Sequence, residues 1–419
     1  MSSLGRRGFL KGGAAALGGG LLASTSTGSV ASAAGSSEIK VEDWNQSLGD
    51  PVVYNAYGVP SEFEAHVQRR NVEWLTVTQE SSVSFTPLHE LDGFTTPNGL
   101  CFERHHGGVA QIDPGAHRLM INGLVEKPLI FTMEDLMRFP RTNRFAFLEC
   151  AANSGMEWRG AQLNGCQFTH GMIHCVQYTG VSLRTLLNEA GLKTNAKWLM
   201  PEGADSAGMN RSIPMEKALD DCIVAFKMNG EALRPEQGYP LRLVVPGWEG
   251  NMWVKWLRRI EVGDQPWHTR EESSKYTDLM EDGSARRFTW IMDAKSVITN
   301  PSPQAPLKTK GHNILSGLAW SGRGKVKRVD VTLDGGKNWQ QAELAGPVLD
   351  KCLTRFYLPF NWNGNPMLVQ SRCIDETGYV QPTKDELRKV RGLNSIYHNN
   401  GIQTWHVREN GEAENVEIS

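Results

Sequence analysis

The chain has 419 residues, with 44 lysines and arginines against 46 aspartates and glutamates, so its formal net charge at pH 7 is −2. This balance lacks the basic footprint that nucleic-acid-binding proteins carry. Beyond an N-terminal leader, no stretch is apolar over the ~18 residues that a membrane-spanning helix needs. The remaining length is sufficient for two or three domains.

The first 33 residues have the pattern of a twin-arginine signal peptide. Arg6 and Arg7 open an RRGFLK motif, a Gly/Ala-rich apolar run follows over 12–23, and an Ala-Ser-Ala cleavage sequence ends at Ala33. The alternative is an unstructured N-terminus with two arginines, but the three signals together favour export. Twin-arginine export transports folded proteins, often with a cofactor already inserted, so we expect a mature protein in the periplasm.

Residues 34–85 are mixed and polar, which indicates an extended N-terminal arm. A short apolar piece then leads into a loop with Arg104, His105 and His106. A guanidinium is a planar donor suited to phosphates and other oxyanions, and the neighbouring histidines would strengthen an anion site. A solvated basic loop explains these residues equally well.

Local signals predict the next elements. Residues 117–123 alternate as a strand into an Asn-Gly turn, and residues 124–131 return. Thr132 and Asp135 form a capping-box pattern, which predicts a short helix that ends before Pro140.

A strand and a glycine-bearing turn then present a thiol. Residues 145–150 alternate, with Phe145, Phe147 and Glu149 on one side, and Cys150 stands at the strand end. A thiolate in this position can bind a soft metal. The local pattern alone fits a small, buried, apolar cysteine better.

Other candidate metal ligands have weak local support. His170 and His174 have the i, i+4 spacing of a metal pair on a helix, but Gly171 and the β-branched Ile173 argue against a helix there. The seven cysteines show no disulfide-framework spacing, and the sequence has no C-x-x-C and no C-x-x-C-H. We therefore expect no iron–sulfur cluster and no covalently attached haem in this chain.

Short helices and strands continue to residue 260. Ser182 precedes an amphipathic helix over 183–190 that Gly191 ends. The other expected elements are strands over 197–200, 223–228 and 241–248 and a helical turn over 215–219.

A change of composition marks a second domain. The segment 300–306 is rich in proline and forms a boundary. Strands follow over 315–320, 356–360 and 368–373, with a glycine-turn hairpin over 329–339. This spacing is typical of a β-sandwich of ~100 residues.

Residues 86–410 resemble the sulfite oxidase family of molybdenum enzymes. The motifs that carry the resemblance are FERHH at 102–106, LECAAN at 148–153, SIP at 212–214, KMNG at 227–230, PGW at 246–248, VKWL at 254–257 and VQP at 380–382. The resemblance implies an α+β fold. A mixed α/β molybdopterin-binding domain would occupy 86–290, an immunoglobulin-like β-sandwich dimerisation domain 291–410, and a tail 411–419.

The resemblance also implies the site. Cys150 would be the thiolate ligand of one Mo-molybdopterin per chain, and Arg104 and Arg355 align with the substrate-pocket arginines of the family. The positions that align near the phosphate and ring of the pterin are His106, Ser206 and Lys255.

Departures from the family pattern bear on the substrate. Ser154 and Gly155 stand where sulfite oxidases have two arginines, Met209 replaces a pocket tyrosine and Phe168 a pocket tryptophan. The lost charge and bulk favour a larger or less anionic substrate than free sulfite. With the sequence at 397–400, the pattern resembles the sulfane dehydrogenase branch, which implies a sulfane sulfur on a carrier-protein cysteine.

The implied chemistry requires partners. Electrons leave a molybdenum centre one at a time, and without a haem motif in this chain we expect a c-type cytochrome subunit as acceptor. The resemblance implies a homodimer through the C-terminal domain or a heterotetramer with the cytochrome. The alternatives are a periplasmic sulfite dehydrogenase acting on free sulfite and, in another class, an exported immunoglobulin-like binding or copper-carrying protein.

Overall fold

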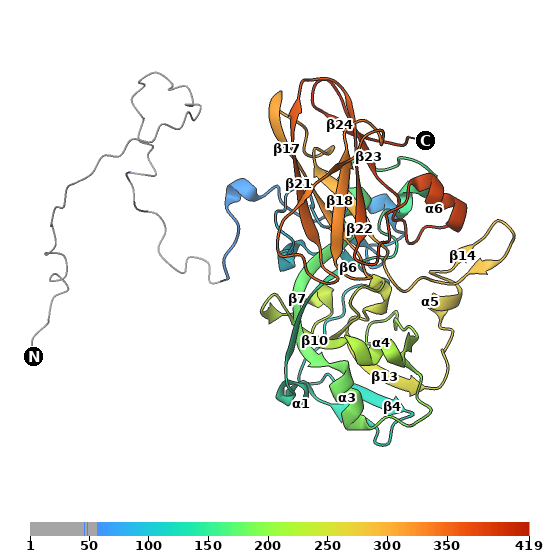
Figure 1. The fold of residues 1–419 in the computed structure, drawn as a ribbon. Coiled ribbons are helices and arrows are strands. Elements are labelled where there is room, and N and C mark those ends of the chain that lie inside the picture. Colours follow the sequence, from blue (N-terminus) through green and yellow to red (C-terminus); the bar gives the residue numbers. More distant parts are fainter. Residues whose placement is uncertain (1–45, 47, 49–56, 419) are drawn as a thin grey trace, which may run out of the picture. The chain divides into compact units, whose positions relative to one another are not determined.

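The computed structural model describes residues 46, 48 and 57–418 (Figure 1). The expected signal peptide, residues 1–33, and the arm as far as residue 45 lie outside the described residues, as do 47 and 49–56. The chain divides into a unit over Met1–Pro60 and a compact unit over Ser61–Ser419, and only the second is described below. Within the described residues, no helix has both the length and the apolar character needed to cross a membrane.

Two five-stranded sheets form most of the first half of the compact unit. In one sheet the order is β11-β10-β7-β6, with β12 paired to β10; in the other it is β5-β4-β13-β8-β9. The strands of the first are β6 (Thr142–Glu149), β7 (Ile173–Ser182), β10 (Ile223–Met228), β11 (Glu231–Ala232) and β12 (Arg242–Val244). Those of the second are β4 (Leu119–Gly123), β5 (Leu129–Phe131), β8 (Trp198–Gly203), β9 (Ile213–Pro214) and β13 (Leu257–Gly263). The first sheet is antiparallel throughout, whereas the second is mixed because β4 and β13 run parallel.

Smaller sheets and short helices complete this half. The smaller sheets join β1 (Arg70–Asn71), β2 (Val83–Phe85) and β3 (Glu103–Arg104), and β14 (Asp278–Leu279) with β15 (Ala285–Arg286). The helices are α1 (Met133–Arg138), α2 (Cys166–His170), α3 (Leu183–Ala190), α4 (Met215–Asp220) and α5 (Arg270–Ser273). A sixth helix, α6 (Lys384–Arg391), lies in the second half.

The second half is a β-sandwich. One sheet contains, in order, β16 (Lys295–Asn300), β17 (Gly311–Trp320), β21 (Thr354–Trp362) and β20 (Glu343–Leu344). The other contains β19 (Gln340–Gln341), β18 (Val326–Thr332), β22 (Met367–Asp375), β23 (Thr404–Val407) and β24 (Ala413–Val416). Both sheets supply side chains to one hydrophobic cluster, as a sandwich requires. This confirms the expected α+β fold of a mixed domain followed by a sandwich.

Several local predictions are confirmed. Helix α1 has Thr132 as N-cap, with both hydrogen bonds of the capping box to Asp135. Helix α3 covers the predicted residues and ends at Gly191, although the side chain of Ser182 makes no capping bond. The hairpin near residue 335 forms between β18 and β19.

The structure differs from the expected boundaries at both ends. Strand β2, expected in the arm, pairs with β3 of the first half, so the compact unit begins earlier than residue 86. Strand β24, expected in a tail, pairs with β23 through four residues. The partner of β2 lies 18 residues further along the chain, whereas β23 and β24 form a local hairpin whose Asn410-Gly411 turn was a readable signal.

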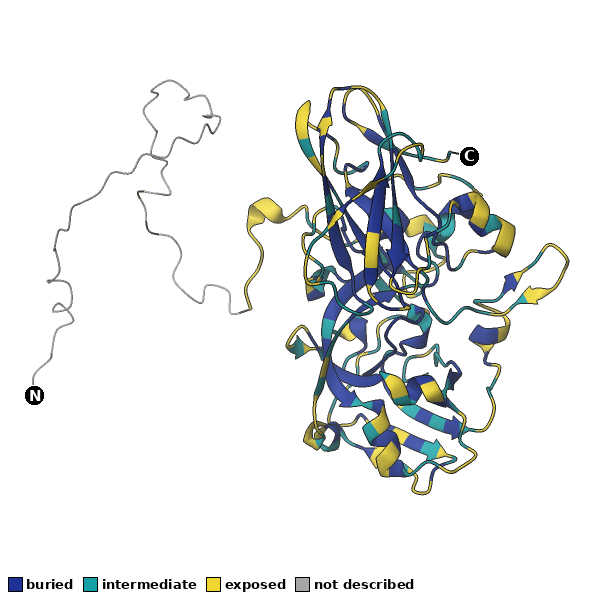
Figure 2. Cartoon of the chain, viewed as in Figure 1, coloured by how far each residue is buried: buried dark blue, intermediate teal, exposed yellow. Residues whose placement is uncertain are grey.

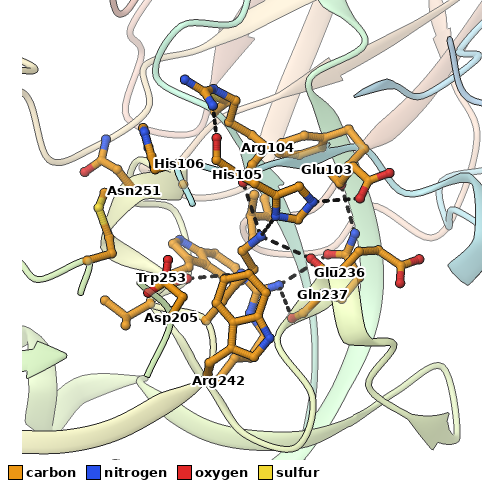
Figure 3. A pocket seen from close by; sticks show the side chains of 18 of the residues that line it. Glu103, Arg104, His105, His106, Asp205, Glu236, Gln237, Arg242, Asn251 and Trp253 are labelled. Atoms are coloured by element: carbon orange, nitrogen blue, oxygen red, sulfur yellow. Dashed lines mark hydrogen bonds and ion pairs between the residues drawn. The ribbon is translucent and has the colours of Figure 1, made fainter. Parts of the chain in front are cut away.

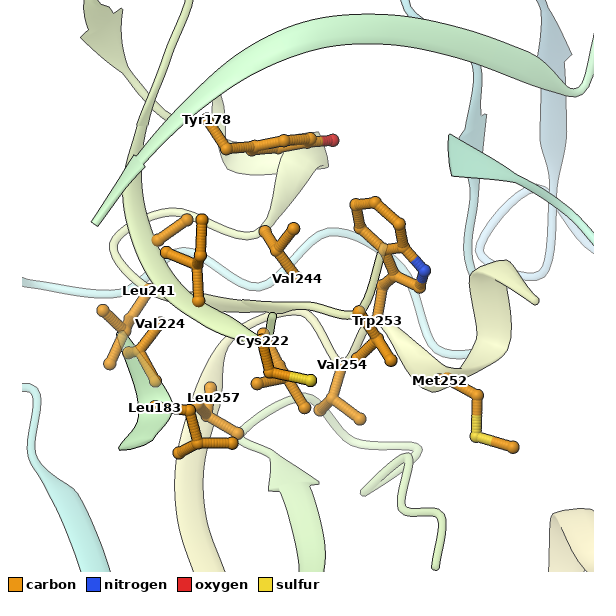
Figure 4. Packing of buried hydrophobic residues seen from close by; sticks show 14 of the residues in the cluster. Tyr178, Leu183, Cys222, Val224, Leu241, Val244, Met252, Trp253, Val254 and Leu257 are labelled. Carbon is orange, nitrogen blue, oxygen red and sulfur yellow. The ribbon is translucent and has the colours of Figure 1, made fainter. Parts of the chain in front are cut away.

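Strand β6 lies between two hydrophobic cores. Ala146 and Leu148 belong to the core of the first half, which also contains Tyr178 and Trp253 (Figure 4). Phe147 belongs to the core of the sandwich. The predicted alternation is therefore real, and both faces of the strand end are buried (Figure 2).

Candidate active site

Cys150 lies at the junction of two adjoining cavities. It follows β6 directly, and its backbone N–H donates to the carbonyl of Met172 at 3.0 Å. The first cavity has about 710 Å³ of empty space and the second about 1280 Å³, part of each open to solvent. The lining of the second includes Tyr276, Tyr397 and Ile396. Burial raises the pKa of the Cys150 thiol, while a backbone hydrogen bond at Ala152 and the guanidinium of Arg104 act in the opposite direction.

The first cavity is lined by cationic groups (Figure 3). Lys255 Nζ donates to the carbonyls of Arg104 at 3.2 Å and Glu236 at 3.1 Å and lies 2.8 Å from His105 Nδ1. Burial, with Arg242 as the next cause, lowers the pKa of Lys255 to about 7. Burial and the nearby Arg104 lower the pKa of His106 to about 4. Both shifts show that this lining destabilises further positive charge.

An unpaired donor points to what the lining can bind. Arg242 is buried in the apolar strand β12, with hydrogen bonds to the carbonyls of Gln237 at 3.0 Å and Trp253 at 3.2 Å. Its Nε is buried without a hydrogen-bond partner among the described residues. Buried cations and unpaired donors are costly unless an anion neutralises them. The lining therefore fits an anionic group.

A close approach of two loops shapes the second cavity. Ser206 Oγ donates to the carbonyl of Gly107 at 3.1 Å. A Cβ on Gly107 would lie 2.2 Å from Ser206 Oγ, so only glycine permits this hydrogen bond between the two loops. The rings of Tyr276 and Tyr397 also line this cavity and contact each other, with their centroids 4.7 Å apart.

Five of the six predicted site residues line these cavities. Arg104, His106 and Cys150 line both, Lys255 lines the first and Ser206 the second.

The structure places Arg355 away from the predicted substrate pocket. Its side chain on β21 is buried and lines neither cavity that contains Cys150. It donates to the carbonyls of Leu91 and Gly93 and to Thr299 Oγ1 at 3.0 Å, so it ties a loop of the first half to the sandwich. Linear alignment placed it in a pocket because position on a strand does not reveal which way the side chain turns.

Two other interpretations are refined. Phe168 lies against Phe85, with ring centroids 5.8 Å apart, and lines neither cavity. His170 ends α2 and His174 stands on β7, so the pair shares no helix, as Gly171 had indicated. Among the described residues, no three His, Cys, Asp or Glu side chains are grouped to hold a metal ion. All seven cysteines lie in the described range as free thiols.

Sequence reasoning missed Arg242, Arg270, Tyr276 and Tyr397. Arg242 could have been found, because an arginine within the apolar LRLVV stretch needs a buried partner. Tyr276 and Tyr397 carried no local signal, since the cavity that they line joins segments over 100 residues apart in the chain.

Family models match both halves of the chain. Residues 106–271 match the oxidoreductase molybdopterin binding domain, and residues 286–405 match the Mo-co oxidoreductase dimerisation domain. Fold and site together define a molybdopterin-binding oxidoreductase with a dimerisation domain. The chain belongs to the sulfite oxidase family of molybdenum enzymes.

Individual relatives support this membership. Sulfite oxidase of Gallus gallus is 33% identical over 364 residues, which cover 79% of this chain and 77% of that protein. The NADH nitrate reductase of Ulva prolifera is 29% identical over 303 residues. This chain spans 35% of the length of that nitrate reductase and 64% of the length of mouse sulfite oxidase. A crystal structure of the sulfane dehydrogenase SoxCD from Paracoccus pantotrophus contains a chain with 61% identity and a TM-score of 0.90, covering 91% of this chain and 98% of that one.

Proposed function

We propose that this protein oxidises a sulfane sulfur carried on a cysteine of a carrier protein, with molybdenum as the redox centre and a c-type cytochrome subunit as electron acceptor. The observation that carries the proposal is the second cavity, which is partly open to solvent and is lined by the thiol of Cys150 and the guanidinium of Arg104 together with Tyr276 and Tyr397. The 61% identity to a sulfane dehydrogenase chain supports the same substrate class.

The residues present fit a molybdopterin cofactor. Cys150 would hold the metal, since a thiolate is the soft ligand that molybdenum accepts. Arg242 and Lys255 would supply positive charge to the anionic part of the pterin, the neutral ring of His106 would hydrogen-bond to it, and Ser206 borders the same region. When bound, the cofactor supplies two-electron oxidation of sulfur with oxygen derived from water.

Arg104 is proposed to orient the substrate and stabilise its charge. It is the only arginine that lines both of these cavities, and its Nη1 donates to the carbonyl of His105. A guanidinium held in this way needs no reorganisation when negative charge develops on sulfur-bound oxygen.

The loop after Cys150 favours a protein-borne substrate over a free anion. Gly155 has no room for a side chain, because its Cβ would lie 2.3 Å from the carbonyl oxygen of Ile396. Ser154 is buried and donates to the carbonyl of Thr169 at 2.8 Å. The two positions where a sulfite-binding pocket would carry arginines are thus packed against the protein itself. Gly155 packs against Ile396, which lines the second cavity, and Ser154 packs against Thr169.

Assays with the full-length, cofactor-loaded protein test the proposal. We expect about one molybdenum per chain, turnover on a sulfane-loaded carrier protein with cytochrome c as acceptor, and little turnover on free sulfite. High turnover on free sulfite without a carrier would establish the sulfite dehydrogenase alternative. Stoichiometric copper without molybdenum or pterin would exclude both enzymes.

The cellular setting is part of the proposal. The N-terminal RRGFLK motif supports twin-arginine export to the periplasm, where a c-type cytochrome is available. The dimerisation domain supports a homodimer or, with the cytochrome, a heterotetramer. We propose that this chain carries no haem of its own, because it lacks a C-x-x-C-H motif.

A further inference from the structure

Glu149, the residue before Cys150, is bound by the sandwich. Its carboxylate is fully buried. Oε1 accepts a hydrogen bond from Lys295 Nζ at 3.0 Å, and Oε2 accepts one from Trp320 Nε1 at 2.7 Å. Lys295 is on β16 and Trp320 on β17, so both donors belong to the second domain. The strand that ends in the proposed metal ligand therefore has its last charge paired across the domain boundary.

Lys295 also holds the loop that follows the thiol. Its Nζ donates to the carbonyl of Asn153 at 3.2 Å. The side chain of Asn153 donates to Glu149 Oε1 at 2.9 Å and accepts from the backbone N–H of Met172 at 3.1 Å, while its backbone N–H donates to the carbonyl of Cys150 at 2.9 Å. One ammonium group thus joins the residues on both sides of Cys150.

The charges in this network lie close to the thiol. Lys295 Nζ and Glu149 Oε1 are 3.0 Å apart, and Glu149 is the residue before Cys150. Lys295 is only 1% exposed, so water screens this ion pair little. Without Lys295, the proposed thiolate ligand would stand beside a buried carboxylate that keeps its hydrogen bonds from Trp320 and Asn153 but has no cationic partner.

We propose that Lys295 is a positioning residue through which the second domain holds and electrostatically balances the Cys150 metal ligand. The inference rests on the proposed role of Cys150 as the molybdenum ligand, and is independent of which sulfur compound is oxidised. Partners of metal ligands commonly change metal affinity or activity about 10- to 100-fold when they are replaced.

The test uses full-length, cofactor-loaded protein with Lys295→Met, Glu149→Gln and the double variant. Lys327→Met is the matched control, since Lys327 is an exposed lysine on β18 of the same domain. We expect Lys295→Met to retain about tenfold less molybdenum after dialysis and to shift the Mo(V) electron paramagnetic resonance spectrum. The double variant should recover most of the lost molybdenum because a neutral amide replaces the buried carboxylate. Lys327→Met should behave as wild type.

The outcomes separate this inference from the proposed function. Wild-type protein that binds no molybdenum would contradict the proposed function. Wild-type protein with normal molybdenum and turnover, together with unchanged retention and spectrum in Lys295→Met, would overturn only the role of Lys295. A double variant as depleted as Lys295→Met would also overturn it. If Lys295→Met fails to fold, the comparison of Glu149→Gln with the double variant remains: equal retention and spectra support charge pairing, and a further loss contradicts it.

Discussion

The backbone N–H of His398 donates to the carbonyl of Ala151, the residue after Cys150, at 2.6 Å. The side chain of Asn399 donates to the carbonyl of Ser154 at 3.0 Å. These bonds hold the segment that follows α6 against the loop over 151–155, and Tyr397 of this segment lines the second cavity. The second domain therefore builds part of the site in addition to carrying the dimerisation sequence.

The first prediction concerns the metal ligand. We expect Cys150→Ser to fold but to lose molybdenum and at least about 100-fold of activity, because the soft thiolate is gone. Metal analysis and steady-state turnover provide the measurement. Cys166→Ala is the control, since Cys166 is buried outside both cavities. Normal molybdenum spectra in Cys150→Ser would contradict the assignment.

Replacing Arg104 should impair catalysis, whereas replacing Arg355 should lower stability. We expect Arg104→Gln to lower kcat/KM by roughly 100- to 1,000-fold, about 3 kcal/mol, with molybdenum content and melting temperature unchanged. Arg355→Gln should instead lower the free energy of unfolding by about 1–3 kcal/mol, because it removes hydrogen bonds to the carbonyls of Leu91 and Gly93 and to the buried Thr299 hydroxyl. Steady-state kinetics and thermal melts of both variants distinguish the roles. A catalytic defect in stable Arg355→Gln would restore the pocket interpretation.

Gly155 should tolerate no side chain. A Cβ there meets the carbonyl oxygen of Ile396 at 2.3 Å, so Gly155→Ala must displace the 396–399 segment. We expect a loss of about 1–3 kcal/mol in unfolding free energy and weaker turnover on the carrier-bound substrate. Gly346→Ala is the control, because nothing lies within 4 Å of a Cβ there. Equal melting temperatures for the two variants would show that the 396–399 segment can shift without a loss of stability.

Lys255 should make the stability of the cofactor-free protein depend on pH. Its folded pKa of about 7 is below the ordinary value of 10.5, so between these values the unfolded chain holds a proton that the folded chain has released. Stability should therefore rise with pH across this window, from the contribution of this group. Denaturant titrations of wild type and Lys255→Met measure the free energy of unfolding of each at several pH values. If the difference between the two free energies stays constant from about pH 7 to 10, the assigned pKa of Lys255 is contradicted.

The leader can be tested independently of the enzyme. Conservative replacement of both Arg6 and Arg7 by lysine should leave the chain in the cytoplasm, because the twin-arginine machinery reads the guanidinium pair. Immunoblots of periplasmic and cytoplasmic fractions measure this. Unchanged export of the double variant would indicate another route.

Sequence alone was sufficient wherever the signal was local. The capping box of α1, the glycine that ends α3 and the alternation of β6 all arise from contacts within a few residues, and each was confirmed. Motifs in family order also brought Arg104 and Cys150 into one site, in which Arg104 ends β3 and Cys150 directly follows β6.

Distant pairings needed the folded chain. Arg355 turned out to bind Leu91 and Gly93, which lie more than 260 residues away in the chain and are not visible in a local pattern. The same holds for Lys295 and Glu149, which are 146 residues apart and meet only when the two domains pack. Hydrogen bonds between buried groups are specified by the position of both partners in space, whereas caps and periodicity are specified by neighbours in the chain.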